Sequence, residues 1–180
     1  MTIRPAGYGD AEQVTAIYAP IVLDTHTSFE EIPPTVNEMR ERIRSYCATY
    51  PWLVAVDGDL VLGYAYACEH RARPGYRWSV DSSVYVAETG RGRGIGKALY
   101  LNLFERLRRQ RFQNVFAGIA LPNDASVALH RSVGFTQIGT YRRVGYKRGA
   151  WIDTAWWQLR IAEDAGAPPE PLPPMQDSAD

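Results

Sequence analysis

Apolar residues in the first part of the chain recur every three or four positions, the spacing of helices that bury one face. Asp10 is expected to cap the first helix, whose apolar face comprises Ala11, Val14, Ile17, Tyr18 and Ile21. Thr35 and Glu38 form a T-x-x-E capping box, in which each side chain satisfies a backbone amide of the other residue, so they predict the start of a second helix. Pro51 stops that helix, because the residue before a proline disfavours helical geometry.

The middle of the chain changes to the two-residue alternation that is typical of strands. Residues 52–56 (WLVAV) and 60–70 (LVLGYAYACEH) flank Asp57 and Gly58, a pair that predicts a hairpin turn. Residues 78–86 alternate as W-S-V-D-S-S-V-Y-V and are rich in β-forming residues. Three strands are therefore expected in succession.

The remainder of the chain alternates between the two patterns. The predicted elements are a helix over about 94–110, a strand over 114–121, a helix from its cap at Asn123 to Gly134, and strands over 135–149 and 151–161. With a short first strand at 2–5, the order is β-α-α-β-β-β-α-β-α-β-β. This order predicts an α/β (α+β) domain with a single mixed central sheet of about seven strands flanked by four helices.

Charge divides the chain into two parts. The formal net charge is zero, but residues 161–180 carry five acidic and no basic residues, so residues 1–160 carry a net charge of +5. The tail also contains APPEPLPP, which is incompatible with a helix interior or a central strand. We therefore predict a folded domain over 1–161 and an acidic, proline-rich tail over 162–180 that is extended or disordered.

Composition disfavours several classes of protein. Zero net charge gives no general attraction to nucleic acid or to a membrane, so neither is an expected partner. The N-terminus lacks an apolar signal-peptide core, and no run of about 18 apolar residues occurs, which favours a soluble cytoplasmic protein. Cys47 and Cys68 lie in apolar-periodic stretches and are interpreted as reduced core thiols rather than as a disulfide.

The segment RGRGIGKALY at 91–100 places three glycines and three cations just before an apolar helical run. A helix start exposes unpaired backbone amides and about half a positive charge, so this segment can hold a phosphate or pyrophosphate. Ile95 and Lys97 stand where a dinucleotide fingerprint needs glycine, and Ala98 stands where a Walker A loop needs serine or threonine. An RNA-binding face is an alternative, although the cations of RLRRQR also suit the end of a helix.

The glycine segment resembles the acyl-CoA pyrophosphate loop of the GNAT N-acetyltransferase superfamily, [R/Q]-x-x-G-x-[G/A]. Residues 83–86 resemble the strand that leads into that loop, and residues 121–135 (LPNDASVALHRSVGF) resemble the second CoA segment of the family. Further stretches are similar to phosphinothricin N-acetyltransferases and their relatives that acetylate methionine sulfoximine: 51–55, 63–67, 82–86, 120–124 and 145–158. The similarity extends over roughly residues 2–160.

The resemblance implies the GNAT fold, acetyl-CoA as co-substrate, no metal, and direct acetyl transfer to an amine through a tetrahedral intermediate. It also implies a homodimer. The implied cofactor-binding residues are Val84, Tyr85, Val86, Arg91, Gly92, Arg93, Gly94, Ile95, Gly96, Lys97, Asn123 and Ser126. A backbone amide near Val84 can polarise the acetyl carbonyl, and Asn123 can serve both the pantetheine arm and the helix as its cap.

Two residues are predicted to move protons. Asp81 lies on a central strand among apolar neighbours, where a carboxylate is costly unless it is paired or used. The subfamily has glutamate at this position, so the shorter aspartate favours a water relay over direct abstraction of the amine proton. His130 corresponds to a histidine of the subfamily and is predicted to protonate the CoA thiolate, with a packed or surface histidine as the alternative. His26 and His70 lack such a placement and are interpreted as structural, although the loop around His26 lines the substrate site in the subfamily.

Substrates of the subfamily carry an α-carboxylate and a polar tetrahedral head. The resemblance gives these substrate-binding candidates: Phe29, Arg71, Arg73, Tyr76 and Tyr100. Arg73 can bind a carboxylate or phosphinate with two hydrogen bonds; solvated loop arginines are the alternative, and core packing is the alternative for Tyr100. The tryptophans at 151, 156 and 157 are interpreted as core or interface residues.

Two other functions stay open. The first is a GNAT acetyltransferase for another amine, such as a protein N-terminus, a polyamine or an aminoglycoside. Arg71 and Arg73 argue against a cationic acceptor, because like charges repel. The second is a non-catalytic acyl-CoA-binding or RNA-binding module.

Overall fold

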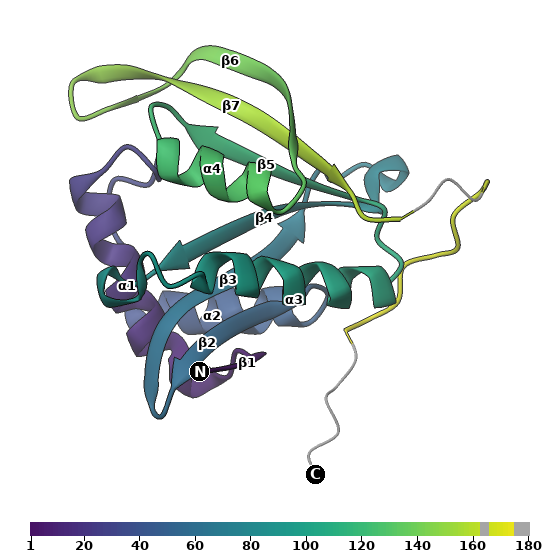
Figure 1. Ribbon diagram of the computed structural model, residues 1–180, viewed down its shortest axis with the longest axis horizontal. Helices are drawn as coiled ribbons and strands as arrows, with labels where there is room; N and C mark the ends of the chain where they lie inside the picture. Colours follow the sequence, from purple (N-terminus) through teal and green to yellow (C-terminus); the bar gives the residue numbers. More distant parts are fainter. Residues whose placement is uncertain (163–165, 175–180) are drawn as a thin grey trace.

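The computed structural model describes residues 1–162 and 166–174 (Figure 1). Seven strands in these residues form one mixed sheet with the order β1-β2-β3-β4-β5-β7-β6. The strands are β1 (Thr2–Pro5), β2 (Trp52–Asp57), β3 (Leu60–Glu69), β4 (Ser79–Val86), β5 (Asn114–Ala120), β6 (Thr136–Lys147) and β7 (Ala150–Arg160), and the helices are α1 (Ala11–Asp24), α2 (Val36–Cys47), α3 (Ile95–Arg109) and α4 (Asp124–Ser132). The predicted order of elements and the predicted fold class are confirmed.

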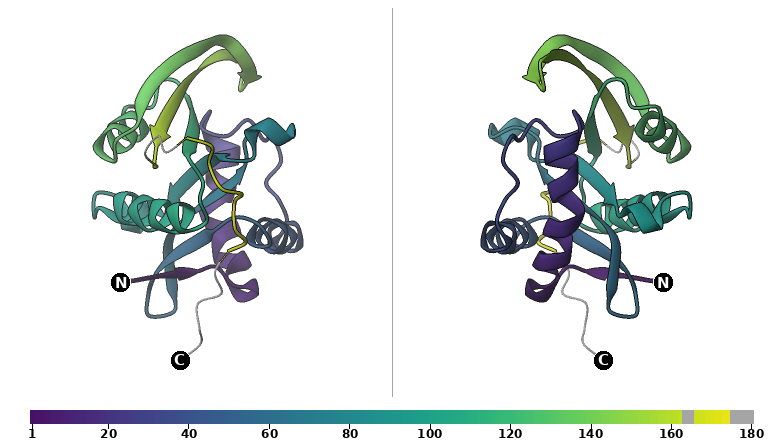
Figure 2. Two further views of the ribbon diagram at one scale, coloured as in Figure 1. Left: turned by 90° about the vertical axis from the view of Figure 1, so that its right-hand side faces the viewer. Right: turned by 90° about the vertical axis from the view of Figure 1, so that its left-hand side faces the viewer.

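Helices cover both faces of the sheet (Figure 2). α1 and α2 lie on one face, where Val14 and Met39 pack with Trp52 of β2. α3 lies on the other face, where Leu99 and Phe104 belong to a second cluster of buried residues, and α4 lies beside it. Each face of the sheet therefore has its own hydrophobic core.

β4 and β5 are parallel neighbours over a short distance only. Residues 79–81 pair with residues 114–116, and the pairing then ends. β4 continues to Val86 while β5 continues beside β7, and the two strands diverge (Figure 1). In the described chain, the edge of β4 that faces β5 has no strand partner after Asp81, so its backbone groups are available to a ligand.

β6 and β7 form a long hairpin that ends the sheet and arches away from the other strands (Figure 2). The end of β6 is held by the buried Lys147, whose ammonium donates to the carbonyls of Val22 and Ser28, both at 2.6 Å. The ring of Phe29 lies against Gly145, where an added Cβ atom would come within 2.1 Å of the ring. These contacts join the hairpin to the last turns of α1 and to the loop between α1 and α2.

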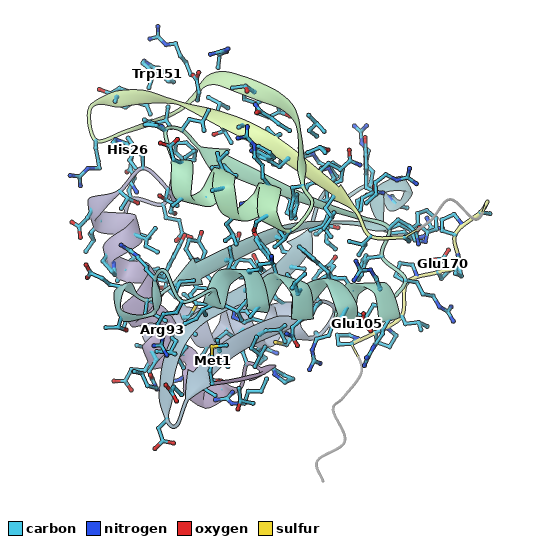
Figure 3. All side chains as sticks on the ribbon, viewed as in Figure 1. Met1, His26, Arg93, Glu105, Trp151 and Glu170 are labelled. Atoms are coloured by element: carbon cyan, nitrogen blue, oxygen red, sulfur yellow. The ribbon has the colours of Figure 1, made fainter. Side chains whose placement is uncertain are left out.

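The described part of the tail, residues 166–174, contains no helix or strand and runs back along the domain. Trp78 Nε1 donates to the carbonyl of Pro169 at 2.8 Å, and Arg77 pairs with Glu170 at 2.6 Å. Glu170 is labelled in Figure 3. Residues 163–165 and 175–180 lie outside the described residues. The division of the chain into a domain and a tail therefore stays a prediction.

Two of the predicted helix caps are confirmed. Thr35 Oγ1 accepts from the N–H of Glu38 at 3.2 Å, and the Glu38 carboxylate accepts from the N–H of Thr35 at 2.6 Å. Asn123 Oδ1 accepts from the N–H of Ser126 at 3.1 Å. Gly134 follows α4 with a φ of 98°, the left-handed geometry that ends many helices.

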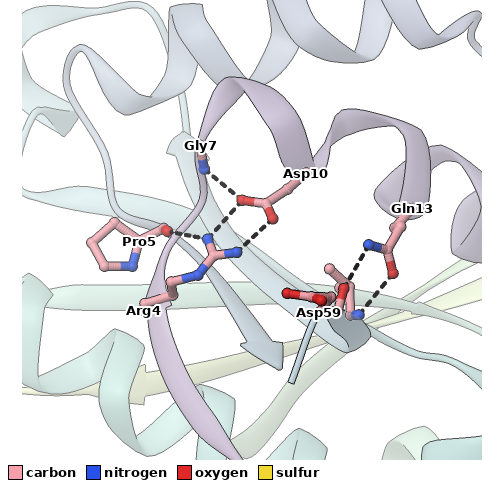
Figure 4. Close-up of polar contacts among 7 residues, drawn as sticks. Arg4, Pro5, Gly7, Asp10, Gln13 and Asp59 are labelled. Carbon is pink, nitrogen blue, oxygen red and sulfur yellow. Dashed lines mark hydrogen bonds and ion pairs between the residues drawn. The ribbon is translucent and has the colours of Figure 1, made fainter. Parts of the chain in front are cut away.

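Asp10 occupies the predicted N-cap position of α1, but its side chain makes no capping hydrogen bond. The Asp10 carboxylate turns back from the helix and accepts two hydrogen bonds from Arg4 and one from the N–H of Gly7, each at 2.7 Å (Figure 4). A two-point guanidinium contact is a stronger partner than a single helix amide. Asp10 therefore joins β1 to the turn before α1, while Gln13 joins α1 to the β2–β3 turn by donating to the carbonyl of Asp59 at 2.8 Å.

Cys47 and Cys68 are free and half-buried. Burial raises the pKa of the Cys68 thiol to about 12, so it stays protonated at neutral pH. Among the helices of the described residues, none has the length and apolar character needed to cross a membrane.

Candidate active site

The glycine loop lies between β4 and α3. Gly92 and Gly94 have φ angles of 73° and 76°, a geometry that glycine adopts without strain, and an added Cβ at either would meet no atom within 4 Å. Gly94 is the N-cap of α3, and no side chain caps this helix. Arg91, Arg93 and Lys97 are exposed around the same turn. The unpaired amides, the open space and the positive charge together fit a pyrophosphate group.

The start of α3 packs closely against α4. A Cβ at Gly96 would lie 3.0 Å from the side chain of Leu129, while Ile95 is buried beneath the loop. Asn123 uses its oxygen to cap α4 through Ser126, and its side-chain nitrogen has no partner among the described residues. Asn123 is therefore able to cap the helix and to donate to a ligand at the same time.

The unpaired end of β4 offers its backbone to a ligand. The ring of Tyr85 packs against Tyr18, with 5.1 Å between ring centroids, and against Tyr64, at 5.2 Å. Val84 and Val86 pack against the hydrophobic core on the opposite face. Because these side chains are engaged in packing, the N–H and C=O groups of this segment are the atoms left for recognition.

His130 is buried, with 4% of its surface exposed. Its Nδ1 lies 2.7 Å from the carbonyl of Ser126, and its Nε2 lies 2.9 Å from the hydroxyl of Tyr100. A carbonyl can only accept, so Nδ1 carries the hydrogen and Nε2 accepts from Tyr100. Burial lowers the pKa of His130, although the Ser126 carbonyl opposes this shift. The neutral ring is therefore favoured at neutral pH, which leaves less of the protonated form that the predicted acid needs.

Asp81 is paired with His70, which the sequence analysis interpreted as a structural residue. Its carboxylate lies 2.6 Å from Nδ1 of His70, and the two side chains are 26% and 12% exposed. The His70 ring lies on Phe116 of β5, with 4.2 Å between ring centroids and 14° between planes. Phe116 is also the strand partner of Asp81 at the last β4–β5 pair. The His70–Asp81 pair therefore lies where the two strands separate.

The β3–β4 register brings this pair together. Asp81 lies opposite Cys68, and His70 follows two residues later, one position past the end of β3 at Glu69. Burial raises the pKa of Asp81, while the hydrogen bond and charge of His70 and the charge of Arg71 oppose that rise. The alternation of residues 60–70 places His70 at the end of a strand. The sequence does not reveal the β3–β4 register that brings His70 beside Asp81.

Arg71 and Tyr76 lie beside the His70–Asp81 pair. The ring of Tyr76 is 6.0 Å from that of His70 between centroids, and the Arg71 guanidinium lies 5.8 Å from the ring of Trp156. The ring of Trp156 is in turn 6.5 Å from that of His70. Trp156, interpreted from the sequence as core or interface, therefore borders this site. Among the other two tryptophans, 157 is buried and 151 is exposed.

The remaining substrate candidates are spread over the molecule. Arg73 lines a groove of about 260 Å³ together with Arg71, Tyr76 and Pro171. Phe29 contacts the β6–β7 hairpin instead, and Tyr100 lies in the core beneath His130. Among the described residues, no group of three or more His, Cys, Asp or Glu side chains is placed to hold a metal ion.

The fold and the site together fit a group-transfer enzyme, with an uncapped, cation-rich helix start and a histidine–aspartate pair at opposite ends of the β4–β5 split. Residues 3–156 match the acetyltransferase (GNAT) domain family, and the chain belongs to this family. The predicted family is confirmed, and the chain is an N-acetyltransferase.

Relatives with named activities align over almost the whole chain. The phosphinothricin N-acetyltransferase of Streptomyces viridochromogenes is 39% identical over 173 residues, which cover 96% of this chain and 93% of the relative. The L-methionine sulfoximine/L-methionine sulfone acetyltransferase of Salmonella typhimurium is 36% identical over 166 residues, which cover 92% and 97%. The crystal structure of a GNAT phosphinothricin acetyltransferase from Sinorhizobium meliloti in complex with AcCoA matches with a TM-score of 0.90 and 39% identity, covering 94% of this chain and 93% of that one.

The burial of His130 predicts a pH dependence of stability. Because its pKa is lowered in the folded state, the neutral ring stabilises the fold above the ordinary histidine value of about 6.5, and this contribution is lost as the pH falls below that value. We expect the free energy of unfolding, measured by urea denaturation, to decrease from about pH 7 to about pH 5, and His130→Gln to weaken the decrease. An unchanged pH slope in His130→Gln would contradict this account.

Proposed function

We propose that this N-acetyltransferase moves the acetyl group of acetyl-CoA to the α-amine of a small amino acid with a polar tetrahedral head, such as phosphinothricin, methionine sulfoximine or methionine sulfone. The observation that carries the proposal is the split between β4 and β5, which joins an anion-binding helix start to an acid–base pair bordered by arginine. The named activities of the relatives support this class of acceptor. Herbicide resistance would then be one consequence of the activity.

Acetyl-CoA supplies the acetyl group as an activated thioester. We assign its pyrophosphate to the backbone amides of residues 92–97, with Arg91 and Arg93 as counter-charges. The open backbone edge at 84–86 would pair with the amides of the pantetheine arm, and Asn123 would donate its free side-chain nitrogen. Ser126, in the first turn of α4, would also contact the cofactor.

The acceptor end requires receptors for negative charge. Arg71 and Arg73 both line the groove beside Tyr76, and we assign them to the carboxylate and the tetrahedral head of the amino acid. Trp156 would form an apolar wall behind Arg71. Phe29 would take part through its loop, which the β6–β7 hairpin holds in place.

The transfer is direct in this scheme. The amine attacks the acetyl carbonyl, and a backbone N–H near Val84 would stabilise the oxyanion of the tetrahedral intermediate. The Tyr100–His130 pair would supply a proton to the departing CoA thiolate. Since burial lowers the pKa of His130, this role depends on a protonated form that is scarce at neutral pH.

We further propose a homodimer that is formed through the outer face of the β6–β7 hairpin. The hairpin carries large apolar residues that are each more than half exposed: Ile138, Tyr141, Val144, Tyr146 and Trp151. Exposed apolar residues gathered on one element are typical of an interface. A second copy would bury the same face on both chains.

We also propose that the enzyme works in the cytoplasm. Its two free cysteines support a reducing compartment, because disulfides are rare there. Nucleic acid is not an expected partner, since the chain carries no net charge.

The substrate class predicts a selective activity. We expect release of free CoA thiol from acetyl-CoA with phosphinothricin, methionine sulfoximine and methionine sulfone, and much slower release with glutamate, methionine, a polyamine or a peptide amine. The reason is that Arg71 and Arg73 favour an acceptor with two negative or polar groups. Turnover confined to the peptide or the polyamine would discard the substrate class and leave the acetyl-CoA site standing.

The glycine loop predicts a specific loss of acetyl-CoA affinity. Gly94 and Gly149 have φ angles of 76° and 78°, and an added Cβ at either meets no atom within 4 Å, so Gly94→Ala and Gly149→Ala impose the same backbone strain. Each should cost about 1–2 kcal/mol of stability if the local geometry is kept. We expect a raised Kd for acetyl-CoA by calorimetry in Gly94→Ala alone. Equal affinities in the two variants would remove the loop from the cofactor site.

The dimer is tested by light scattering coupled to size-exclusion chromatography. Trp151 and Leu60 are both 53% exposed, but Leu60 lies at the β2–β3 turn, away from the hairpin. We expect Trp151→Glu to shift a dimer toward monomer, since the interface would bury a charge, and Leu60→Glu to leave the dimer intact. A monomeric parent protein would refute the proposed interface.

A further inference from the structure

His70 is held in a defined orientation. Its Nδ1 contacts Asp81 at 2.6 Å, its face lies on Phe116, and its ring meets Tyr76 and Trp156 at 6.0 and 6.5 Å between centroids. Its Nε2 has no hydrogen-bond partner among the described residues, and this atom is not buried. One ring nitrogen is therefore fixed by the protein, and the other is accessible to solvent and to a ligand.

We propose that His70 is the general base of the acetyl transfer and that Asp81 positions it instead of taking the proton itself. This inference rests on the proposed function, because the proton concerned belongs to the acceptor amine. It replaces the sequence-based prediction in which Asp81 acts alone or through water. One oxygen of the Asp81 carboxylate, Oδ1, is already engaged with His70 Nδ1.

The chemistry of the two groups favours this division of roles. Asp81 is acceptor-only when ionised, so Nδ1 of the neutral His70 ring carries the hydrogen and Nε2 keeps a lone pair. Histidine is the side chain whose ordinary titration range lies closest to neutral pH, which suits a general base. A carboxylate that fixes the tautomer and stabilises the charged ring is the arrangement found in other histidine-based sites.

The acetyl transfer balances in protons and electrons with acetyl-CoA and the acceptor amine as its reactants. The acceptor ammonium gives one proton to His70 Nε2, while Nδ1 keeps its hydrogen bond to Asp81. The freed lone pair forms the N–C bond, the C–S bond breaks, and sulfur leaves with its electron pair. The nitrogen loses a second proton as the amide forms, the thiolate gains one proton, and His70 releases its proton to solvent.

The groups that face His70 come from several elements. Asp81 belongs to β4, Cys68 to β3, and Tyr76 to a short 3-10 turn at Pro74–Tyr76. Arg71 donates to the carbonyl of His70 at 2.7 Å and lies beside Trp156. Cys68 stays protonated at neutral pH, since burial raises its pKa to about 12. Among the described residues, Asp81 is therefore the charged side chain in hydrogen-bond contact with the ring.

The proposal is tested by steady-state kinetics on two replacements of the histidine. His70→Phe keeps a ring on Phe116 but has no nitrogen, and His70→Asn keeps a donor for Asp81 but lacks Nε2. We expect both to lower kcat by about 100-fold or more, the scale of general-base catalysis, with KM for acetyl-CoA unchanged. Free imidazole should restore part of the activity of His70→Gly.

Asp81→Asn tests the positioning role. We expect a lower kcat with an unchanged KM for acetyl-CoA, and no rescue by imidazole, because the histidine is still present but has lost the carboxylate that orients it. Asp153→Asn is the matched control, since the Asp153 side chain is 27% exposed against 26% for Asp81 and pairs with Arg142 on the hairpin. It should keep the parental kcat.

The possible results distinguish a failure of the His70 inference from a failure of the proposed function. A parent enzyme that acetylates its amine, with His70→Phe near the parental kcat and Asp81→Asn inactive, would make Asp81 the base and overturn the inference alone. Nitrogen-15 NMR of the parent protein gives a test that does not depend on a variant that folds: a hydrogen on Nδ1 of His70 supports the proposal, and a hydrogen on Nε2 overturns it. A parent enzyme that acetylates none of the amines would overturn the proposed function, and the inference with it.

Discussion

The site depends on the way in which β4 and β5 share hydrogen bonds for three residue pairs and then part. Parallel strands normally satisfy each other's backbone groups along their whole length. Here β5 stays paired with β7 along its whole length, while β4 beyond Asp81 keeps only β3. The backbone of β4 after Asp81 is therefore both rigid, because β3 holds one edge, and unsatisfied on the other edge. A ligand can complete such an edge without any change in the fold.

The split places two kinds of chemistry at its opposite ends. At one end the chain leaves β4, turns through Gly92 and Gly94, and enters α3 with uncapped amides and surrounding cations. At the other end, where the last strand pair holds, Phe116 supports the His70 ring against Asp81. A donor with a phosphate-rich handle and a reactive acyl end matches this arrangement, because one end is bound by charge and the other is brought to a base.

The two histidines near the site differ in what surrounds them. His130 is enclosed, with Nδ1 on the Ser126 carbonyl and Nε2 on the Tyr100 hydroxyl, so burial disfavours its charged form. His70 has a carboxylate at one nitrogen and an accessible second nitrogen. The first environment stabilises a neutral ring within the core. The second fixes the orientation of the ring and leaves one nitrogen open to a ligand.

The sequence by itself determined the element order, the capping box of α2, the cap of α4 and the glycine-rich, basic turn at 91–97 that opens α3, because each depends on residues that are close together in the chain. It also placed Asp81 on a central strand and Arg71 in the loop before it. Only the tertiary structure decided that Asp10 binds Arg4 in place of a helix amide, that Tyr100 supports His130 from the core, and that His70 and Trp156 join Asp81 and Arg71. These contacts depend on strand register and on pairing between segments far apart in sequence: Asp81 lies opposite Cys68, and Trp156 lies on β7 opposite Gly118 of β5. Periodicity assigns a residue to a face of its own strand, but the partner across the sheet is fixed only when the strands align and their cores close.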